Sequence, residues 1–292
     1  VQEDTIDNVV KLVNNLDLNE IKLVLDTDTV VVNQLKFDNC LLVKINETYD
    51  NFDAIKKAAK EYKEAHDGEL SFVRSRLADE QSRRVFDSVI EYKLCGRPKL
   101  LFGCESPEID AWKLLDLKKD ESYLDLGAYT GDTISSFIET AGSYGNIYAF
   151  EPDARNFRKL SENTAGLSNC NLYNIAVSDK KETVRFLKNA GRGSSAKGGK
   201  EIFIDADSVD NVLKDRTVSV IKFDVEGEEK KAIAGAERVI KRDHPKMMIA
   251  AYHRTEDLFA IPMQVLDIDP YYKLYLRHSP CLPAWEINYM FI

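Results

Sequence analysis

The sequence has too few cysteines, in too scattered a pattern, for a disulfide framework or a zinc site. The five cysteines among 292 residues are Cys40, Cys95, Cys104, Cys170 and Cys281. They are odd in number, and no two of them form the C-x-x-C pair that structural zinc sites use. Such a pattern is typical of an enzyme in a reducing compartment, so we expect a cytoplasmic protein.

Two further absences argue against other classes of protein. No apolar run approaches the roughly 20 residues of a membrane-spanning helix, and the opening stretch VQEDTIDNVVKLV lacks a signal-peptide pattern. That stretch also lacks an initiating Met, so we expect that a leading residue or segment has been removed. The net charge is −9, whereas a nucleic-acid binder usually presents a basic face. We therefore expect neither a membrane nor a nucleic-acid partner.

The first 105 residues have an α+β pattern that differs from the rest of the chain. Three strand-like runs, over 21–25, 29–32 and 35–45, are followed there by two helix-prone segments, over 54–65 and 77–94. The segment CGRPKLLFGCESPE (95–108) has the Gly and Pro content of a linker. We predict an N-terminal region over 1–105 that contacts substrate, acts as a lid or mediates oligomerisation, and a main domain over 106–292.

From about residue 109, strand-like and helix-like segments alternate, which predicts a parallel, doubly wound sheet. The strands are expected in SYLDLG, NIYAFEP, NLYNIAVS, SVIKFDVEG and KMMIAAYH, with a two-strand excursion in TVRFLK and EIFID. The closing strands YYKLYLR and WEINYMFI follow one another closely, so one of them should be antiparallel at the sheet edge. Before them, TEDLFAIPMQVL should be helical unless Pro262 breaks it.

The loop in YLDLGAYTGDT (123–133) follows the first of these strands and indicates the kind of ligand. Dinucleotide-binding folds place G-x-G-x-x-G here, so that the backbone can approach a pyrophosphate. In this chain Gly127 is kept, but Tyr129 and Asp132 replace the second and third glycines. A tyrosine would crowd a pyrophosphate, and Asp125 and Asp132 would repel it. S-adenosylmethionine (SAM) fits better, because Asp125 can pair with its cationic part while N–H groups at the helix start bind its carboxylate.

A second acid supports a nucleoside ligand. Glu151 ends the next strand in YAFEPD and follows Asp125 by 26 residues. An acid about 20 residues beyond a glycine loop accepts hydrogen bonds from the ribose hydroxyls in nucleotide-binding folds. The two acids and the glycines in one βαβ unit therefore predict a SAM site.

Four motifs in this order, DLGAYTGDT, AFEPD, NIAVSD and IKFDVEG, resemble the FkbM-type class I SAM-dependent methyltransferases. The resemblance covers about 120–256. It implies an α/β fold with a Rossmann-like, seven-stranded, mostly parallel sheet, and methyl transfer to a hydroxyl, often of a sugar or natural product. Residues 1–105 have no counterpart in it, so the acceptor is not implied.

The resemblance also implies cofactor contacts by position. Asp125, Gly127, Gly131 and Glu151 would bind SAM, and Asn174, Ile175 and Ala176 would border the adenine. Tyr129 stands where many members have Asn. The expected cofactor-binding set is completed by Ala128, Tyr129, Asp132, Thr133, Pro152 and Asp224.

Three strand-end residues are candidates for the chemistry. Asp224 and Glu226 follow the strand in IKFDVEG, and His253 ends the next strand, in MMIAAYH, so the strand count predicts that Asp224 and His253 lie close together. A hydroxyl acceptor needs a proton acceptor, and His253, with an ordinary pKa near 6.5, is the natural general base. The same three residues suit a divalent metal, but their spacing is not diagnostic and a metal is the less favoured alternative. Alternatively, Asp224 caps the following helix and His253 is a structural histidine.

Other functions remain open at this point. The basic loop 189–200 either receives an anionic acceptor, such as a nucleotide-linked sugar, or is simply solvated. An NAD-dependent oxidoreductase is possible on the same fold, although the missing glycines argue against it. A non-catalytic SAM-binding or interaction protein is the other alternative, for which the unassigned first hundred residues are the support. The favoured prediction is a SAM-dependent O-methyltransferase acting on a small molecule.

Overall fold

The computed structural model describes residues 29–35, 39–44, 52–95, 99–188, 200–280 and 286–292. The strand expected at 21–25 and most of the basic loop 189–200 lie outside these residues. Among the described residues, no helix combines the length and the apolar character needed to cross a bilayer.

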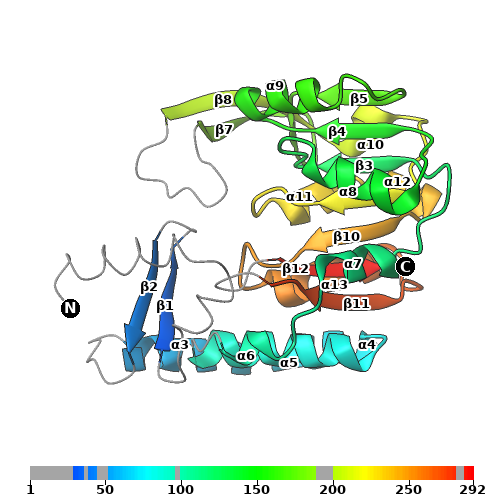
Figure 1. The fold of residues 1–292 in the computed structure, drawn as a ribbon. Coiled ribbons are helices and arrows are strands. Elements are labelled where there is room, and N and C mark those ends of the chain that lie inside the picture. The colour runs from blue at the N-terminus through cyan, green and yellow to red at the C-terminus, as the bar shows by residue number, and fades with distance from the viewer. Residues whose placement is uncertain (1–28, 36–38, 45–51, 96–98, 189–199, 281–285) are drawn as a thin grey trace.

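A seven-stranded sheet forms the centre of the molecule (Figure 1). Its order is β11-β12-β10-β9-β3-β4-β5, with bounds Leu274–His278, Ile287–Phe291, Lys246–Ala250, Val220–Phe223, Tyr123–Leu126, Ile147–Phe150 and Cys170–Tyr173. The strands β3, β4, β5, β9 and β10 are parallel, and β12 is antiparallel to both of its neighbours. The predicted Rossmann-like sheet is confirmed. The antiparallel strand, however, lies second from the edge rather than at the edge, because β11 pairs outside it.

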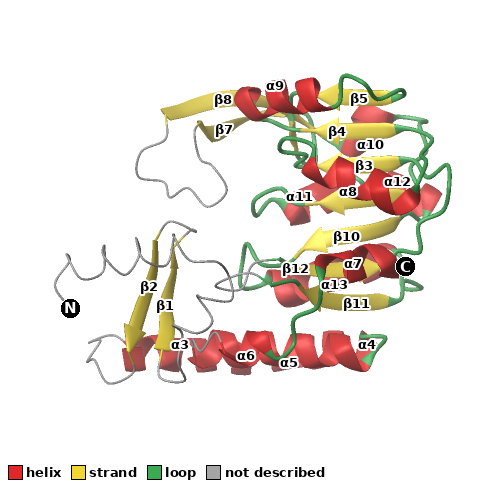
Figure 2. Cartoon of the chain, viewed as in Figure 1, coloured by secondary structure: helices red, strands yellow, loops and turns green. Residues whose placement is uncertain are grey.

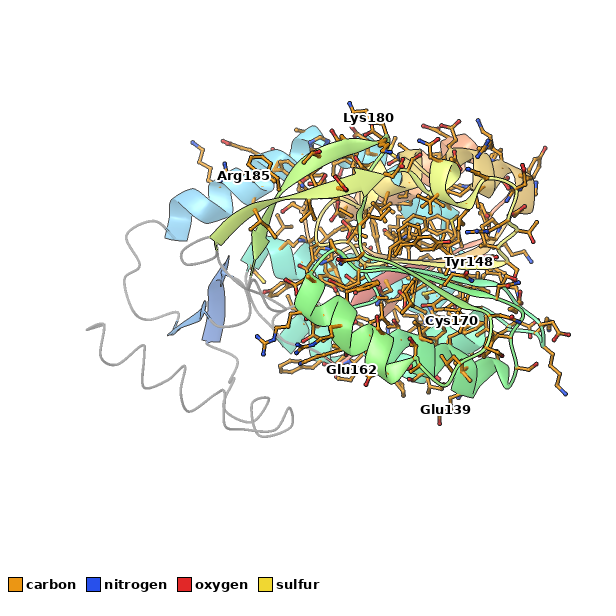
Figure 3. All side chains as sticks on the ribbon, turned by 90° about the horizontal axis from the view of Figure 1, so that it is seen from above. Glu139, Tyr148, Glu162, Cys170, Lys180 and Arg185 are labelled. Carbon is orange, nitrogen blue, oxygen red and sulfur yellow. The ribbon has the colours of Figure 1, made fainter. Side chains whose placement is uncertain are left out.

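Helices cover both faces of the sheet (Figure 2). The first face carries α7 (Glu108–Leu114), α8 (Asp132–Ala141) and α9 (Ala154–Asn163), whose apolar residues pack with Tyr123 and Ala149. Glu139 and Glu162 lie on the solvent side of α8 and α9 (Figure 3). The opposite face is packed around Leu124 and Phe150. Successive strand residues therefore alternate between two apolar cores, which explains why these strands are hydrophobic almost throughout.

The second face is covered by α10 (Val209–Leu213), α11 (Glu229–Ala234), α12 (Glu237–Asp243) and α13 (Asp257–Ile268). The sequence EKKAIAGAERVIKR (229–242) predicts a single helix, but in the structure it is broken between α11 and α12. Gly235 lies at the break, so close to the backbone of Ser178 that a Cβ would come within 2.1 Å of that carbonyl oxygen. In contrast, α13 continues through Pro262.

A smaller sheet contains the two-strand excursion. Its order is β6-β8-β7, with bounds Ala176–Val177, Lys200–Asp207 and Glu182–Lys188. The antiparallel pair β7 and β8 extends away from the main sheet in Figure 1. The strand expected in NLYNIAVS is thus divided between two sheets.

The N-terminal helices belong to the core around the main sheet. A two-stranded sheet of β1 (Thr29–Leu35) and β2 (Asn39–Lys44) precedes α3 (Phe52–Ala65), α4 (Asp67–Arg76), α5 (Glu80–Cys95) and α6 (Lys99–Phe102). Buried residues of α4, α5 and α6, such as Val73, Phe86 and Leu101, share one core with the strands. Leu77 also forms a parallel bridge with Leu274. The expected linker over 95–108 therefore does not separate two hydrophobic cores.

Candidate functional site

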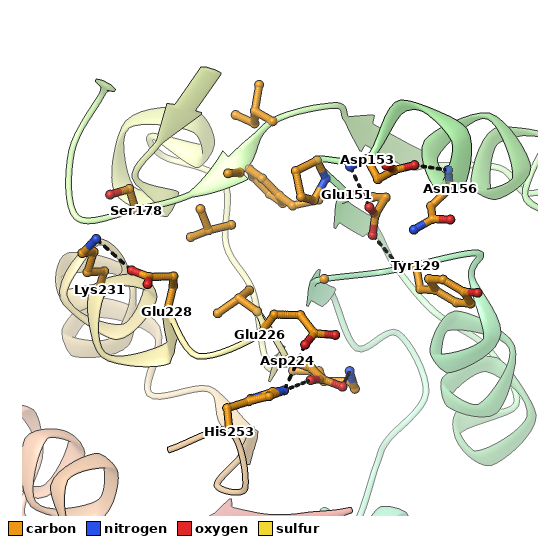
Figure 4. Close-up of a pocket in the computed structure, with 18 of the residues that line it drawn as sticks. Tyr129, Glu151, Asp153, Asn156, Ser178, Asp224, Glu226, Glu228, Lys231 and His253 are labelled. Carbon is orange, nitrogen blue, oxygen red and sulfur yellow. Dashed lines mark hydrogen bonds and ion pairs between the residues drawn. The ribbon is translucent and has the colours of Figure 1, made fainter. Parts of the chain in front are cut away.

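A cavity of about 640 Å³ opens at the carboxyl ends of the central strands. Most of the residues singled out in the sequence line it, namely Gly127, Tyr129, Asp132, Thr133, Glu151, Pro152, Ile175, Ala176, Asp224, Glu226 and His253. Four others lie outside the lining, namely Asp125, Ala128, Gly131 and Asn174. Figure 4 shows two groups of side chains facing each other, with Tyr129 and Glu151 on one side and Asp224, Glu226 and His253 on the other.

The loop after β3 is shaped by residues with a left-handed backbone. Gly127 has φ of +88° and Gly131, which precedes α8, has φ of +90°. Tyr129 has φ of +48°, a conformation that side-chain-bearing residues adopt rarely and Asn more readily than most. The N–H groups of Gly127 and Ala128 both donate to the carbonyl of Phe150, at 3.0 and 2.9 Å. These bonds fix the loop against the end of β4.

Asp125 lies beneath the cavity wall. Its side chain is fully buried and accepts a hydrogen bond of 2.5 Å from the Thr133 hydroxyl. Burial raises the pKa of Asp125 despite the nearby charge of Lys222. The direct pairing of Asp125 with a cationic ligand stays a prediction, and in the structure its carboxylate is buried and lies outside the cavity lining. Its observed contact holds Thr133, which does line the cavity.

Glu151 occupies the place expected for a ribose-binding acid. It is 6% exposed and lies in the cavity wall, where its two oxygens accept the N–H groups of Tyr129 and Asp153 at 2.9 and 2.8 Å. Burial raises the pKa of Glu151 to about 7. Asn174 lies outside the cavity and donates to the Glu151 carbonyl at 2.8 Å, so it supports the end of β4.

Asp224 lies at the end of β9 and is held by three groups. Lys222 donates to Oδ2 at 3.1 Å, Tyr252 donates to Oδ1 at 3.1 Å, and His253 Nε2 lies 3.6 Å from Oδ1. Burial alone would raise the pKa of Asp224, but the charges of Lys222 and His253 outweigh it and lower the pKa below the ordinary value. Asp224 is therefore ionised at neutral pH. The proximity of Asp224 and His253, predicted from the strand count, is confirmed.

His253 lies among three carboxylates. Its Nε2 is 3.6 Å from Asp224 and 3.7 Å from Glu226, and its Nδ1 is 2.9 Å from Glu229. Burial would lower the pKa of His253, but the acids, Glu229 foremost, raise it to about 9. The ring is therefore charged at neutral pH. The expectation of a neutral base that titrates near 6.5 left out Glu229, which is the main cause of the raised pKa of His253.

Glu229 is fully buried at the start of α11. Its Oε1 accepts the N–H groups of Val225 and Gly227 at 2.9 and 3.3 Å. In the sequence it is one acid in the run EGEE, and acids are common at helix starts because they interact favourably with the helix dipole. The run contains no signal that this one is buried and faces a histidine.

The sequence suggested Asp224, Glu226 and His253 as alternative metal ligands, but the group whose ligand atoms lie together among the described residues has Glu229 in place of Glu226. Asp224, Glu229 and His253 each offer a ligand atom within 4.8 Å of the others. However, the two ring nitrogens of His253 face different carboxylates, and both oxygens of Asp224 already accept hydrogen bonds. This geometry fits a charged imidazole between carboxylates better than ligands converging on one ion.

The cavity and its loops coincide with a known family domain. A model of the methyltransferase FkbM domain matches residues 125–274, just over half of the chain. This chain belongs to the FkbM methyltransferase family. Within this family member, the match runs from β3 to the first residue of β11 and includes every candidate residue from Asp125 to His253.

A solved structure agrees with this assignment. The FkbM methyltransferase from Methylobacillus flagellatus is similar with a TM-score of 0.68 and 25% identity, over 80% of this chain and 60% of that chain. The FkbM-family chain thus spans 60% of that relative's length. An rRNA methylase from Streptococcus thermophilus has a TM-score of 0.43 and 15% identity, over 64% of this chain and 96% of that one. Fibrillarin from Aeropyrum pernix, with bound SAM, has a TM-score of 0.40 and 16% identity, over 64% and 74%. These two likenesses are too weak to carry an argument about ligands. A search of curated proteins found no match.

Proposed function

We propose that this FkbM-family protein is a SAM-dependent O-methyltransferase that acts on a hydroxyl of a small molecule, such as a sugar or natural product. The observation that supports this most strongly is the arrangement of one cavity. Tyr129 and Glu151 form one side, and the side chain of the ionised Asp224 lies on the other. A cofactor and an acceptor can therefore meet between them.

The cavity residues fit SAM. A volume of about 640 Å³ lies within the range of small-molecule sites. Glu151 would accept the ribose hydroxyls, Ile175 and Ala176 would border the adenine, and the loop at Gly127 would hold the amino-acid end. When bound, SAM supplies a methyl group on a positively charged sulfur. The acids of the lining suit that charge.

The acceptor side needs a group that takes a proton. Asp224 is ionised and lies in the cavity wall, and its carboxylate is oriented by Tyr252 and Lys222. An oxygen that has gained a methyl group holds its proton weakly, so a carboxylate suffices and a stronger base is not required. We assign the proton to Asp224, with the more exposed Glu226 beside it. His253, charged at neutral pH, then orients the carboxylates rather than acting as the base.

Small-molecule acceptors are favoured over nucleic acid because the chain has a net charge of −9. None of the cavity-lining residues lies in the described part of 1–105. A role of that region as a lid or oligomerisation module, and a cytoplasmic location, stay predictions.

The test combines binding and transfer with the full chain. S-adenosylhomocysteine (SAH) should bind by calorimetry, and NADH should not. Label from methyl-labelled SAM should then appear on a hydroxyl when sugars and glycosides are offered. Binding of NADH in place of SAH would contradict the cofactor. Tight SAH binding, with no transfer to any hydroxyl compound offered, would favour the non-catalytic SAM-binding alternative.

A variant pair locates the cofactor. Glu151→Ala should weaken SAH binding by about 1.5–3 kcal/mol, the usual contribution of hydrogen bonds to a charged group. The matched control is Glu162→Ala, on the exposed side of α9, which should leave the affinity unchanged. Equal SAH affinities of the two variants would show that Glu151 does not contact the ligand.

A further inference from the structure

Glu229 has contacts that go beyond those of a buried structural acid. One oxygen, Oε1, reaches three groups that carry the active-site turn, namely the N–H groups of Val225 and Gly227 and the ring nitrogen Nδ1 of His253. We propose that Glu229 is a positioning residue for methyl transfer, which fixes the turn between β9 and α11 and holds the charged His253 ring against Asp224. This inference rests on the proposed function and deepens it.

The turn that carries Asp224 is strained and needs such support. Glu226 has φ of +57° and Gly227 has φ of +97°. A non-glycine residue in this region carries backbone strain and persists only where the surroundings impose it. Two of those constraints are the hydrogen bonds to Glu229, and a third is Arg254, whose Nε donates to the Gly227 carbonyl at 2.6 Å. Glu229 therefore determines where the turn directs Asp224 and Glu226.

The ring of His253 connects Glu229 to Asp224. The Nδ1 side faces Glu229, and the Nε2 side faces Asp224 at 3.6 Å and Glu226 at 3.7 Å. The ring and Glu229 are mutually dependent, because a fully buried carboxylate without a cationic neighbour is strongly destabilising. At 2.9 Å, Nδ1 is not aligned with Oε1 for a hydrogen bond, and among the described residues it has no hydrogen-bond partner. The contact is therefore mainly one of charge.

Other groups around the ring define its electrostatic setting. Asp257, at the start of α13, adds a further acid near His253 and accepts the Arg254 N–H at 2.7 Å. Tyr252 packs its ring 4.2 Å from the His253 ring and donates to Asp224, and Lys222 lies on the far side of Asp224. The acids around His253 outnumber the cations, so a neutral ring would leave Glu229 uncompensated. We expect that loss of the Glu229 charge would deprotonate the ring and release Asp224 from one of its three partners.

The experiment compares Glu229→Gln with Glu237→Gln in the full chain. Glu237 is an exposed acid on α12, paired with Lys241. The chain has four histidines, so their ring signals can be titrated by NMR, with His253 assigned from a His253→Gln sample. In wild type and Glu237→Gln, the His253 ring should stay protonated through pH 8. In Glu229→Gln, its pKa should fall toward the ordinary value of about 6.5.

Turnover supplies the second measurement. At pH 8, kcat of Glu229→Gln should fall by roughly 10–100-fold, the cost of a small misplacement of a reacting group, while the KM for SAM stays near wild type. Lowering the pH to about 6, where the ring regains its proton, should restore part of the loss. A purely structural role would instead lower the melting temperature and SAH affinity together, with no pH-dependent recovery.

Several results would overturn the proposal. One is a wild-type His253 that titrates near pH 6.5, and another is an unchanged His253 pKa in Glu229→Gln. Selective loss of the His253 signal on adding Mn²⁺, with chelator-sensitive turnover, would make the cluster a metal site instead. If Glu229→Gln does not fold, the wild-type titration and Glu229→Asp, which keeps the charge and should keep the ring protonated, still decide the question. The NMR titrations need no methyl acceptor, so they test the role of Glu229 even if the protein transfers no methyl group. Failure of the proposed function would show only in the turnover measurements.

Discussion

Gly127 and Asp224 touch through their backbones at the point where β3 and β9 end. A Cβ on Gly127 would lie 1.9 Å from the carbonyl oxygen of Asp224, and the Asp224 N–H donates to the Leu126 carbonyl at 2.9 Å. The loop proposed to bind the cofactor and the acid proposed to take the proton are therefore held at van der Waals distance. A shift of either backbone must therefore displace the other.

Gly127→Ala should therefore destabilise the fold and disturb the site. The left-handed backbone alone costs roughly 1–2 kcal/mol for a residue with a Cβ, and the overlap with Asp224 adds to it. Urea denaturation would measure the free energy of unfolding, and calorimetry the SAH affinity. The control is Gly166→Ala, where nothing lies within 4 Å of the added Cβ. A Gly127→Ala protein as stable as this control would contradict the close approach.

SAH affinity should depend on pH through Glu151. Its pKa is raised to about 7 by burial, and ribose hydroxyls donate best to the ionised carboxylate. Because binding favours the ionised form, affinity should be full above pH 7 and fall as the pH drops below it, by up to about tenfold per unit. Glu151→Gln cannot ionise, so its affinity should be weaker and flat between pH 5.5 and 8. A wild-type affinity that is also flat would show that Glu151 does not contact the ligand.

Replacing Asp224 should affect turnover more than binding. Asp224→Asn removes the proton acceptor but keeps the size of the side chain, so kcat should fall by roughly 10²–10⁴-fold, the usual range for a positioned base. Tyr252→Phe, which removes one hydrogen bond to the same carboxylate, should have a much smaller effect. Initial rates at saturating SAM would measure both. Comparable rates for Asp224→Asn and wild type would exclude Asp224 as the base.

The ion pair between Asp79 and Arg277 should stabilise the attachment of the N-terminal helices. Arg277 on β11 donates to Asp79 at 2.6 Å and to Ser82 on α5 at 2.9 Å. Burial raises the pKa of Asp79, but the Arg277 bonds prevail and lower it to about 2. Because this pKa is depressed, the contribution is present above about pH 4 and is lost as the pH falls toward 2.

Asp79→Asn should accordingly lower the free energy of unfolding at pH 7 by about 1–3 kcal/mol, the usual range for hydrogen bonds to charged groups. The difference from wild type should shrink at acid pH, as followed by urea denaturation. Glu64→Gln, which removes an exposed ion pair with Lys60 on α3, is the control and should change little. An Asp79→Asn difference that persists unchanged at pH 2 would contradict the charge-based explanation.

The parallel part of the sheet and the proximity of Asp224 and His253 could both be predicted from the sequence. Strands that alternate with helices lie parallel, so residues at their carboxyl ends gather at one edge. This local rule placed the two residues correctly without any knowledge of strand order.

Other features depended on contacts between distant parts of the chain. The position of β12 between β10 and β11 follows from pairings that no local pattern encodes. The helix α4, DGELSFVRSR, buries only Leu70 and Val73, so it shows little amphipathic periodicity. Glu229 could not be distinguished from its acidic neighbours, because its burial is imposed by α11 packing onto the turn. The raised pKa of His253 could not be foreseen from the sequence for the same reason.

The position of β12 also affects the order in which parts of the chain can fold during synthesis. Among the described strands, β11 pairs in the sheet with β12, which follows it in the chain, and α5 in turn packs on β11. During synthesis, which proceeds at about 5–20 residues per second, the apolar face of α5 must therefore wait for β12 before it is fully covered. A ribosome-bound chain ending at residue 286 should thus remain sensitive to protease around α5, and become resistant once the final strand has emerged.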